Sequence, residues 1–313
     1  MSVKVFIDGS SGTTGLRIAD RLAQRPEIEL LSISAEGRKD VNERAKVINS
    51  ADLAFLCLPD AASKEVMPLL RPDVKVLDTS TAFRTDAAWD YGFPELKGQK
   101  AKIQNSYRVA VPGCYASGFI SIARPLVELG LVPQSYPFSC TGISGYSGGG
   151  KKMIAEYESA DRPAHSKLDA PKSYGLGLAH KHLPEMQKIS GLAHTPMFVP
   201  VVCDYYCGMQ VLVPLDLTLA GSTAEQVAEG IAAYYKDAAT VKVHALNETL
   251  PENGLYSNAM AGTDRMELYM TVNAAGDQMM LVSVFDNLGK GSSGAAVQCM
   301  NLMLGLEETE GLE

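Results

Sequence analysis

Apolar, β-rich runs alternate with helical patterns over residues 3–78, and this alternation constrains the fold more than any other feature of the chain. The segments follow in the order strand, helix, strand, helix, strand, helix, strand, at Val3–Asp8, Thr14–Arg25, Leu30–Ser34, Val41–Asn49, Leu53–Leu58, Ala61–Leu70 and Val74–Asp78. Successive strands that are joined by helices run parallel, and the helices cover both faces of the sheet. The sequence therefore predicts an α/β fold with a doubly covered parallel sheet.

The pattern changes near Pro112. A helical stretch over residues 115–129 comes first, and longer β-rich runs follow at Ser135–Ser144, Phe198–Val202, Met209–Leu219, Glu267–Asn273 and Met279–Phe285. These runs predict an α+β domain built on a mixed or antiparallel sheet. The segment Gly145–Ser190 between them is too long for a passive connector, so we expect it to serve a site. The chain returns to helix at Gly294–Leu304.

Composition narrows the class of protein. The 313 residues exceed the usual length of one domain, so two domains are expected. The net charge of -8 argues against a nucleic-acid surface, although a local basic pocket for an anionic small substrate is still allowed. No apolar run reaches the roughly 18 residues of a membrane helix, and the N-terminal residues lack the order of a signal peptide. We therefore expect a cytoplasmic protein that binds neither nucleic acid nor a membrane, with six cysteines that form no disulfides.

A glycine loop follows the first predicted strand and opens the first predicted helix. Glycines let the backbone turn tightly and approach a pyrophosphate, which the N–H groups of the helix N-terminus attract. The candidate cofactor-binding residues are Gly9, Ser10, Gly12, Thr13, Thr14 and Gly15. This context favours a Rossmann-like dinucleotide-binding domain. The alternative is a tight turn in a flavodoxin-like protein that has no dinucleotide.

The second predicted strand ends near a short charged stretch that bears on the choice of cofactor. NAD enzymes usually place an acidic residue here against the ribose hydroxyls. This chain has Arg38 and Lys39, which can bind a 2′-phosphate and so favour NADP, whereas Glu36 keeps NAD open. A solvated turn is the alternative for the two basic residues.

Cys114 has the most informative surroundings of the six cysteines. An apolar strand stops at Pro112-Gly113, and a helical pattern begins directly after Cys114. The field at a helix N-terminus favours the thiolate and lowers the pKa of a thiol, which makes the sulfur a nucleophile. The pair Cys203 and Cys207 is a weak candidate for a metal site because its spacing is not that of a zinc pair, and we predict no metal.

Two histidines, His180 and His182, precede a predicted helix that has Pro184 in its first turn. One of them can act as general acid and base for the sulfur and the reacting carbonyl, with Glu185 orienting it. Which of the two carries the proton stays open. The alternative is a pair of surface or hydrogen-bonded core histidines.

Five motifs in the same order make the chain resemble the N-acetyl-γ-glutamyl-phosphate reductases of arginine biosynthesis, in their shorter form, within the wider semialdehyde dehydrogenase family. The motifs are Leu77–Arg84, Tyr91–Leu96, Val111–Ala116, the His-x-His-x-Pro-Glu of residues 180–185, and Asp286–Gly291. Ser117, where many members carry Thr, and Ser10-Ser11 are small departures. The resemblance runs through nearly the whole chain.

The resemblance implies an NADP-dependent oxidoreductase that reduces its acyl phosphate through a thioester on Cys114 and releases inorganic phosphate. It implies that Asn287 reaches the nicotinamide and that the last helix packs on the cofactor domain. We therefore assign residues 1–113 and 288–313 to the NADP-binding domain and 114–287 to a catalytic and oligomerisation domain, with a homodimer or homotetramer expected. The candidate substrate-binding residues are Arg84, Arg108, Ser147 and Lys151, because phosphate and carboxylate groups need cationic or N–H partners. A surface ion pair is the alternative for each arginine.

Three other functions remain open from the sequence. Aspartate-semialdehyde dehydrogenase would share the fold and the chemistry with a shorter substrate. A related reductase would act on a carrier-bound acyl phosphate. A nucleotide-sensing regulator would keep the fold without catalysis, and Cys114 together with the two histidines argues against it.

Overall fold

The computed structural model describes residues 2–313. Contacts divide the chain into two compact units. The first unit holds the residues up to Pro94 together with Gly98–Gly113 and Ser292–Leu312. The second unit holds Glu95–Lys97, Cys114–Gly291 and Glu313. Residues 288–291, which the sequence placed with the terminal helix, group with the second unit, where Lys290 forms an ion pair with Glu95.

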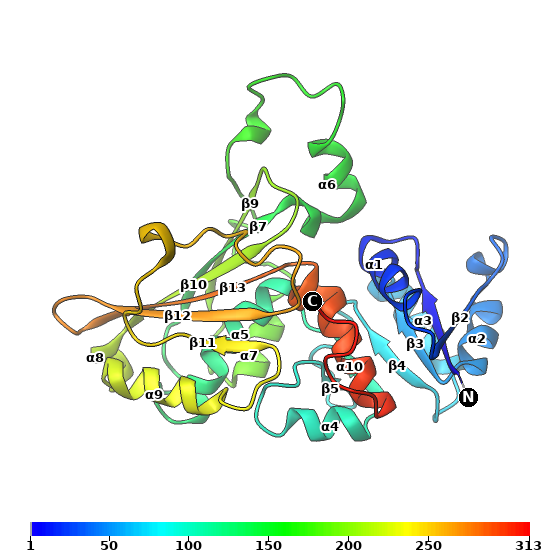
Figure 1. Cartoon of the computed structure of the whole chain (residues 1–313), viewed down its shortest axis with the longest axis horizontal. Coiled ribbons are helices and arrows are strands. Elements are labelled where there is room, and N and C mark those ends of the chain that lie inside the picture. The colour runs from blue at the N-terminus through cyan, green and yellow to red at the C-terminus, as the bar shows by residue number, and fades with distance from the viewer. Residues whose placement is uncertain (1) are drawn as a thin grey trace. The chain divides into compact units, whose positions relative to one another are not determined.

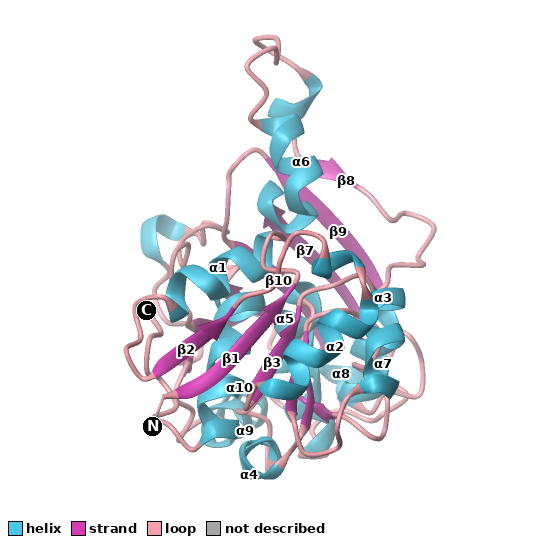
Figure 2. Ribbon diagram, turned by 90° about the vertical axis from the view of Figure 1, so that its right-hand side faces the viewer, coloured by secondary structure: helices cyan, strands magenta, loops and turns pink. Residues whose placement is uncertain are grey.

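The first unit contains one parallel sheet with the strand order β2-β1-β3-β4-β6-β5. Its strands are β1 (Val3–Asp8), β2 (Ile28–Leu31), β3 (Leu53–Leu56), β4 (Lys75–Asp78), β5 (Asp90–Tyr91) and β6 (Arg108–Ala110). Its helices are α1 (Thr13–Leu22), α2 (Val41–Ser50), α3 (Asp60–Val66), α4 (Gln99–Asn105) and α10 (Gly294–Leu304). Figure 2 shows β2, β1 and β3 side by side among these helices. The predicted α/β fold with a parallel sheet is confirmed.

Helices cover both faces of this sheet, as the sequence predicts. On one face, side chains of α1, α4 and α10 such as Ile18, Ile103 and Met300 pack on the strands. On the other face, Ile48 of α2 and Val66 of α3 do the same. The strand order reverses direction between β1 and β3, so the carboxyl ends of these two strands flank the crevice in which such sheets bind their ligands.

The second unit contains one mixed sheet with the order β11-β12-β13-β10-β7-β9-β8 (Figure 1). Its strands are β7 (Ser139–Gly145), β8 (Lys172–Ser173), β9 (Met197–Cys203), β10 (Met209–Asp216), β11 (Val241–Val243), β12 (Met266–Val272) and β13 (Gln278–Phe285). Its helices are α5 (Cys114–Glu128), α6 (Gly150–Tyr157), α7 (Leu183–Ser190), α8 (Leu217–Ala220) and α9 (Ala224–Tyr234). The pairs β7–β9 and β11–β12 are parallel and the other neighbours antiparallel, which confirms the predicted mixed sheet.

Helix α5 packs on β10 and β13 through a glycine. A Cβ atom at Gly118 would stand 2.6 Å from a methyl of Val211 and 2.7 Å from Oγ of Ser283. The hydroxyl of Ser283 also donates to the carbonyl of Gly118 at 3.2 Å. Because only a residue without a side chain allows this approach, Gly118 sets how closely α5, which begins at Cys114, lies on the sheet.

The structure differs from the sequence prediction at several strand ends, such as those of β2, which the sequence predicts at Leu30–Ser34 and which spans Ile28–Leu31. Two of the differences have a clear local cause. The run Met209–Leu219 is not one strand, because Asp216 ends β10 and its carboxylate accepts a hydrogen bond from the N–H of Leu219 at the start of α8. The run predicted from Ser135 begins its strand only at Ser139, after a turn that the N–H of Phe138 closes on the carbonyl of Tyr136. Over residues 2–313, every helix is too short or too polar to cross a membrane.

Candidate active site

The glycine loop between β1 and α1 is shaped by close backbone contacts. Gly9 has φ +90°, and a Cβ atom there would stand 2.3 Å from the carbonyl oxygen of Cys57. A Cβ at Gly15 would stand 2.5 Å from the carbonyl oxygen of Gly9. Helix α1 begins with Thr13 and Thr14, and in the described structure no side chain caps its first N–H groups. A glycine loop with such close backbone contacts, followed by helix N–H groups that no side chain caps, fits a pyrophosphate.

Two small cavities at this loop bring several predicted residues together. One, of about 190 Å³, is lined by Gly9, Ser10 and Arg38 among others, and the second, of about 180 Å³, also includes Ser10 and Arg38. Arg38 is exposed in the 3₁₀ turn Gly37–Lys39, and Lys39 lines neither cavity. Arg38 thus lines both cavities beside the glycine loop, and its binding of a 2′-phosphate stays a prediction.

Asp8 has its carboxyl group directly before the glycine loop, and a buried arginine compensates the charge of that group. Arg44 of α2 lies 2.8 Å from Asp8, with both side chains buried. Burial raises the pKa of the Asp8 carboxyl above its ordinary value, and the pairing with Arg44 opposes that shift. Sequence reasoning missed Arg44, because 36 positions separate it from Asp8 and no motif marks it.

Cys114 is the first residue of α5 and is half-buried. A Cβ atom at Gly291 would stand 3.0 Å from Cβ of Cys114, so the backbone of that glycine lies against the cysteine. Other cysteines are less suited to react, since burial raises the pKa of Cys57 to about 12 and that of Cys140 above its ordinary value.

The neighbour of Cys114 in α5 lies near both histidines. The ring centroid of Tyr115 lies 5.9 Å from that of His180 and 6.1 Å from that of His182. Burial raises the pKa of the Tyr115 phenol well above its ordinary value, with further contributions from Tyr174 and Cys114. The start of α5 and the two histidines therefore come together in the second unit.

His180 and His182 are in direct contact. Their ring centroids are 4.8 Å apart at 83°, and the backbone N–H of His182 donates to Nδ1 of His180 at 3.2 Å. Burial, and then Lys181, lowers the pKa of His180 to about 4. His180 is therefore neutral at pH 7, and its proton sits on Nε2 because Nδ1 accepts a hydrogen bond. His182 is buried, with 5% of its surface exposed.

Aromatic side chains pack against the ring of His180. Phe198 of β9 lies 5.2 Å and Tyr174 lies 5.9 Å from its ring, both nearly edge-on. The hydroxyl of Tyr174 donates to that of Tyr115 at 3.5 Å. Sequence reasoning missed Tyr174 and Phe198, because ordinary core packing uses the same residue types. Glu185 lies buried in the first turn of α7, and its orienting role stays a prediction.

Asn287 follows β13 and joins two loops of the second unit. Its Oδ1 accepts from the N–H of Gly208 at 2.8 Å, and its Nδ2 donates to Oγ of Ser147 at 3.0 Å. All three polar groups are buried. Lys151 lies exposed in the first turn of α6, close in the chain to Ser147. The structure thus brings Asn287 and Ser147 together within one hydrogen-bond network.

The two candidate arginines have different surroundings. Arg84 is buried and donates to the carbonyls of Thr79 and Val111, each at 2.9 Å, directly beyond the carboxyl ends of β4 and β6. Arg108 instead begins β6 and donates to the carbonyls of Arg71, Pro72, Val74 and Tyr107. The expectation that Arg108 binds substrate is therefore corrected: its donors hold the amino-end loops of the sheet.

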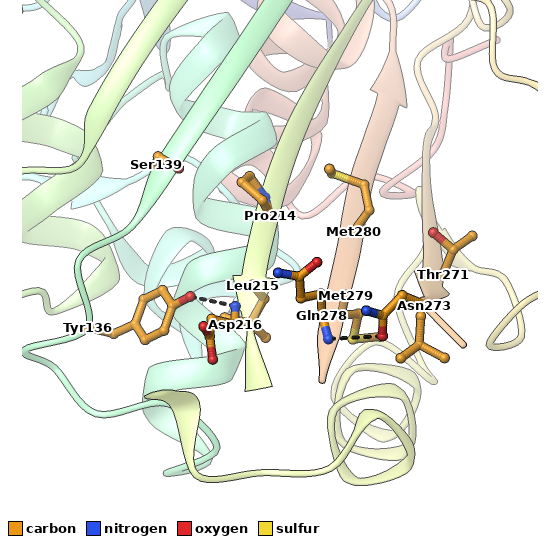
Figure 3. A pocket seen from close by; sticks show the side chains of 11 residues that line it. Tyr136, Ser139, Pro214, Leu215, Asp216, Thr271, Asn273, Gln278, Met279 and Met280 are labelled. Atoms are coloured by element: carbon orange, nitrogen blue, oxygen red, sulfur yellow. Dashed lines mark hydrogen bonds between the residues drawn. The ribbon is translucent and has the colours of Figure 1, made fainter. Parts of the chain in front are cut away.

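A cavity of about 560 Å³ lies elsewhere in the second unit, at the end of β10 and the start of β13 (Figure 3). Tyr136, Asp216 and Gln278 line it. None of the predicted site residues lines this cavity. Asn287, for example, follows the opposite end of β13. Among residues 2–313 no group of three or more His, Cys, Asp or Glu residues is arranged to hold a metal ion.

Comparison with known proteins defines the family. The NAD binding domain of semialdehyde dehydrogenases matches residues 4–104, and the dimerisation domain of semialdehyde dehydrogenases matches residues 114–287. An N-acetyl-gamma-glutamyl-phosphate reductase of Trichormus variabilis is 46% identical over 318 residues, which cover 99% of each chain. One of Burkholderia cenocepacia is 46% identical over 305 residues, 96% of this chain and 97% of the relative.

Solved structures share the fold at low sequence identity. Aspartate semialdehyde dehydrogenase II from Vibrio cholerae superposes with a TM-score of 0.72 at 19% identity, over 97% of this chain and 99% of that one. Aspartate semialdehyde dehydrogenase with NADP from Candida albicans gives a TM-score of 0.65 at 14% identity, over the same shares. From the two domain models and the full-length relatives at 46% identity, the chain belongs to the semialdehyde dehydrogenase family.

Proposed function

We propose that this protein catalyses the NADPH-dependent reductive dephosphorylation of N-acetyl-γ-glutamyl phosphate to N-acetylglutamate 5-semialdehyde, a step of arginine biosynthesis. The relatives that carry this activity in their names match nearly the full length of the chain at 46% identity. The observation that carries the proposal is Cys114 at the first position of α5, half-exposed and in the same unit as the His180–His182 pair. Such a thiol is suited to covalent catalysis on an acyl group.

The glycine loop and Arg38 are proposed to hold the cofactor. The free N–H groups at the start of α1 would bind the pyrophosphate, and Arg38 would bind the 2′-phosphate that distinguishes NADPH from NADH. Asn287 is proposed to contact the nicotinamide amide through the hydrogen-bonding capacity of its side-chain amide that its bonds to Gly208 and Ser147 do not use. Bound NADPH supplies the hydride that takes the acyl group to the level of an aldehyde.

The residues of this chain divide the reaction into two parts. Sγ of Cys114 forms a bond to the acyl carbon, the bond from that carbon to the phosphate oxygen breaks, and inorganic phosphate leaves with the electron pair. A thioester on Cys114 remains, which is neutral and a better hydride acceptor than a charged acyl phosphate. We propose that the histidine pair takes the proton of the thiol when the sulfur attacks and returns it to the sulfur when the aldehyde departs. His180, with its proton on Nε2, would donate a hydrogen bond to the acyl oxygen.

Substrate anchoring is proposed for three groups. Arg84 would pair with an anionic group beyond the carboxyl ends of β4 and β6. Ser147 and Lys151 would contact the phosphate from the loop that precedes α6 and from its first turn. An anion needs such charged or hydroxyl donors because its burial without partners is costly.

Self-association is part of the proposal. The matching model for residues 114–287 is that of a dimerisation domain, which supports a homo-oligomer. We propose a dimer or tetramer in the cytoplasm, and light scattering coupled to size exclusion measures which of the two forms.

One assay tests the function. The reaction is run in reverse with N-acetylglutamate semialdehyde, inorganic phosphate and NADP, and the absorbance of the reduced cofactor is followed. We expect phosphate-dependent reduction of NADP, which Cys114→Ser lowers by on the order of 10³-fold or more, because a serine hydroxyl is a far weaker nucleophile. The matched control is Cys203→Ser, the same exchange at a half-buried cysteine outside the proposed site, which should keep the parent rate.

The outcomes separate the alternatives. Turnover with aspartate semialdehyde alone would select aspartate-semialdehyde dehydrogenase activity. Turnover of a carrier-bound acyl group alone would select the related carrier-dependent reductase. Binding of NADP without turnover of any aldehyde would select a regulator.

A further inference from the structure

Glu95, from the motif Tyr91–Leu96, and Lys290, from the motif Asp286–Gly291, form a buried ion pair in the second unit. Nζ of Lys290 lies 2.7 Å from Oε1 of Glu95, and each side chain is only 1% exposed. The hydroxyl of Thr240 donates to the same carboxylate oxygen. The partners are 195 positions apart in the chain, so the tertiary fold alone creates the pair.

A buried ion pair needs an explanation beyond stability. Taking two charges out of water costs several kcal/mol per ion, and apolar residues of similar volume often stabilise a protein as well or better. Fixed geometry is the property that a buried, hydrogen-bonded pair supplies and an apolar contact does not. The geometry that this ion pair fixes is that of the backbone on either side of Lys290.

Lys290 belongs to the π-helical turn Gly289–Ser293, and this turn lies against the proposed nucleophile. The glycine after Lys290 has its backbone against Cys114, since a Cβ at Gly291 would stand 3.0 Å from Cβ of Cys114. The glycine before Lys290 is equally confined, since a Cβ at Gly289 would stand 2.0 Å from the carbonyl oxygen of Thr263. The backbone on both sides of Lys290 is therefore closely packed, and on one side it packs against Cys114.

The turn is also tied at its start. Asp286 is fully buried; its Oδ1 accepts from the N–H of Leu288 at 2.7 Å, and its Oδ2 accepts from the N–H of Gly262 at 2.6 Å. Its carbonyl oxygen accepts from the N–H of Gly291 at 2.9 Å. Hydrogen bonds to Asp286 thus hold the start of the turn. The ion pair adds a side-chain contact between Lys290, within the turn, and Glu95.

We propose that Glu95 and Lys290 are positioning residues that hold this turn against Cys114 and so fix the direction in which the thiol points. The catalytic consequence rests on the proposed function, whereas the effect on the thiol itself does not. Neither residue touches the reacting atoms. Their loss changes how Cys114 reacts without removing any group of the chemistry.

The test measures the thiol directly. In the full-length protein, the rate at which iodoacetamide alkylates Cys114 is followed from neutral to alkaline pH by mass spectrometry of the peptide that contains it. The main variant is the double substitution Glu95→Gln with Lys290→Met, which leaves no uncompensated buried charge and is expected to fold. A milder variant, Thr240→Val, removes only the hydroxyl that contacts Glu95.

We expect the double variant to change the pH profile of Cys114 alkylation and to lower kcat roughly 10- to 100-fold with KM for NADPH unchanged, as small displacements of a reacting group do. Thr240→Val should shift the alkylation profile in the same direction by less. The matched control is Glu267→Gln, which weakens the contacts of this β12 residue with His244, which follows β11, and with Tyr269 of β12. It should lower the melting temperature and leave Cys114 alkylation as in the parent.

A parent-like alkylation profile in both the double variant and Thr240→Val overturns the inference. The same holds if Glu267→Gln shifts the profile as much as they do, because the effect would then follow general stability. If the variants change the alkylation profile of Cys114 but the parent protein reduces NADP with none of the aldehydes, the positioning role stands and the proposed function is rejected.

Discussion

The backbone N–H of His182 donates a hydrogen bond to Nδ1 of His180, and this one bond decides the tautomer of the neutral imidazole. With Nδ1 as acceptor, Nε2 of His180 carries the proton. Two residues that the sequence left equivalent thereby acquire different properties. His180 is a hydrogen-bond donor near neutral pH, and His182 holds it in that form.

The first prediction concerns the titration of His180. Because burial lowers its pKa from 6.5 to about 4, the ring should stay neutral through mildly acidic pH. The contribution of the neutral ring to stability is complete above about pH 6.5 and is lost as the pH falls through about 4. Nitrogen-15 NMR of the imidazoles checks both the midpoint and the tautomer, with His180→Gln to assign the signal. A midpoint above 6 or a proton on Nδ1 would contradict it.

The second prediction is the choice of cofactor. Arg38→Ala should raise KM for NADPH roughly 10- to 100-fold and leave that for NADH unchanged, because a charge-assisted hydrogen bond to a phosphate is worth about 1.5–3 kcal/mol. Steady-state kinetics with both cofactors measures this. Lys39→Ala is the matched control, since Lys39 is equally exposed but lines neither cavity at the glycine loop. Equal losses for the two cofactors would remove Arg38 from the site.

The third prediction concerns the buried pair Asp8–Arg44. Arg44→Met should lower the free energy of unfolding by about 3–5 kcal/mol, because the Asp8 carboxylate is left buried without its counter-charge. It should also weaken NADPH binding, since that carboxylate directly precedes the glycine loop. Urea unfolding and cofactor titration measure the two effects. Lys46→Met on the same helix breaks an exposed pair with Glu43 and should change neither quantity.

The fourth prediction concerns Asn287. Asn287→Ala leaves the buried N–H of Gly208 without its acceptor and should cost about 1–3 kcal/mol of stability. It should also raise KM for NADPH, because the same substitution releases Ser147 and removes the proposed nicotinamide contact. Differential scanning calorimetry and steady-state kinetics test the two parts separately. A lower melting temperature with unchanged KM would give Asn287 a structural role only.

The fold and part of the candidate site could be predicted from residues near one another in the chain. The strand β1, the glycine loop and the start of α1 form one continuous stretch, so their order already indicates how the backbone turns. Cys114 could likewise be placed at a helix start, because the strand before it ends ahead of Pro112-Gly113 and the helical pattern follows directly. The two arginines could not be told apart in this way, because the difference between Arg84 and Arg108 lies in the carbonyls that each reaches in the folded chain.

By itself, the sequence determined the alternation of elements and the parallel and mixed sheets, which follow from side-chain periodicity and from backbone preferences that act over a few residues. Five motifs in the same order indicated the family, and the helix start at Cys114 indicated a candidate nucleophile. Only the tertiary structure decided which buried charges are paired and which polar groups share a network. Asp8 with Arg44, Ser147 with Asn287 and Glu95 with Lys290 are 36, 140 and 195 positions apart, and a hydrogen bond or ion pair forms only when folding brings the atoms within about 3 Å.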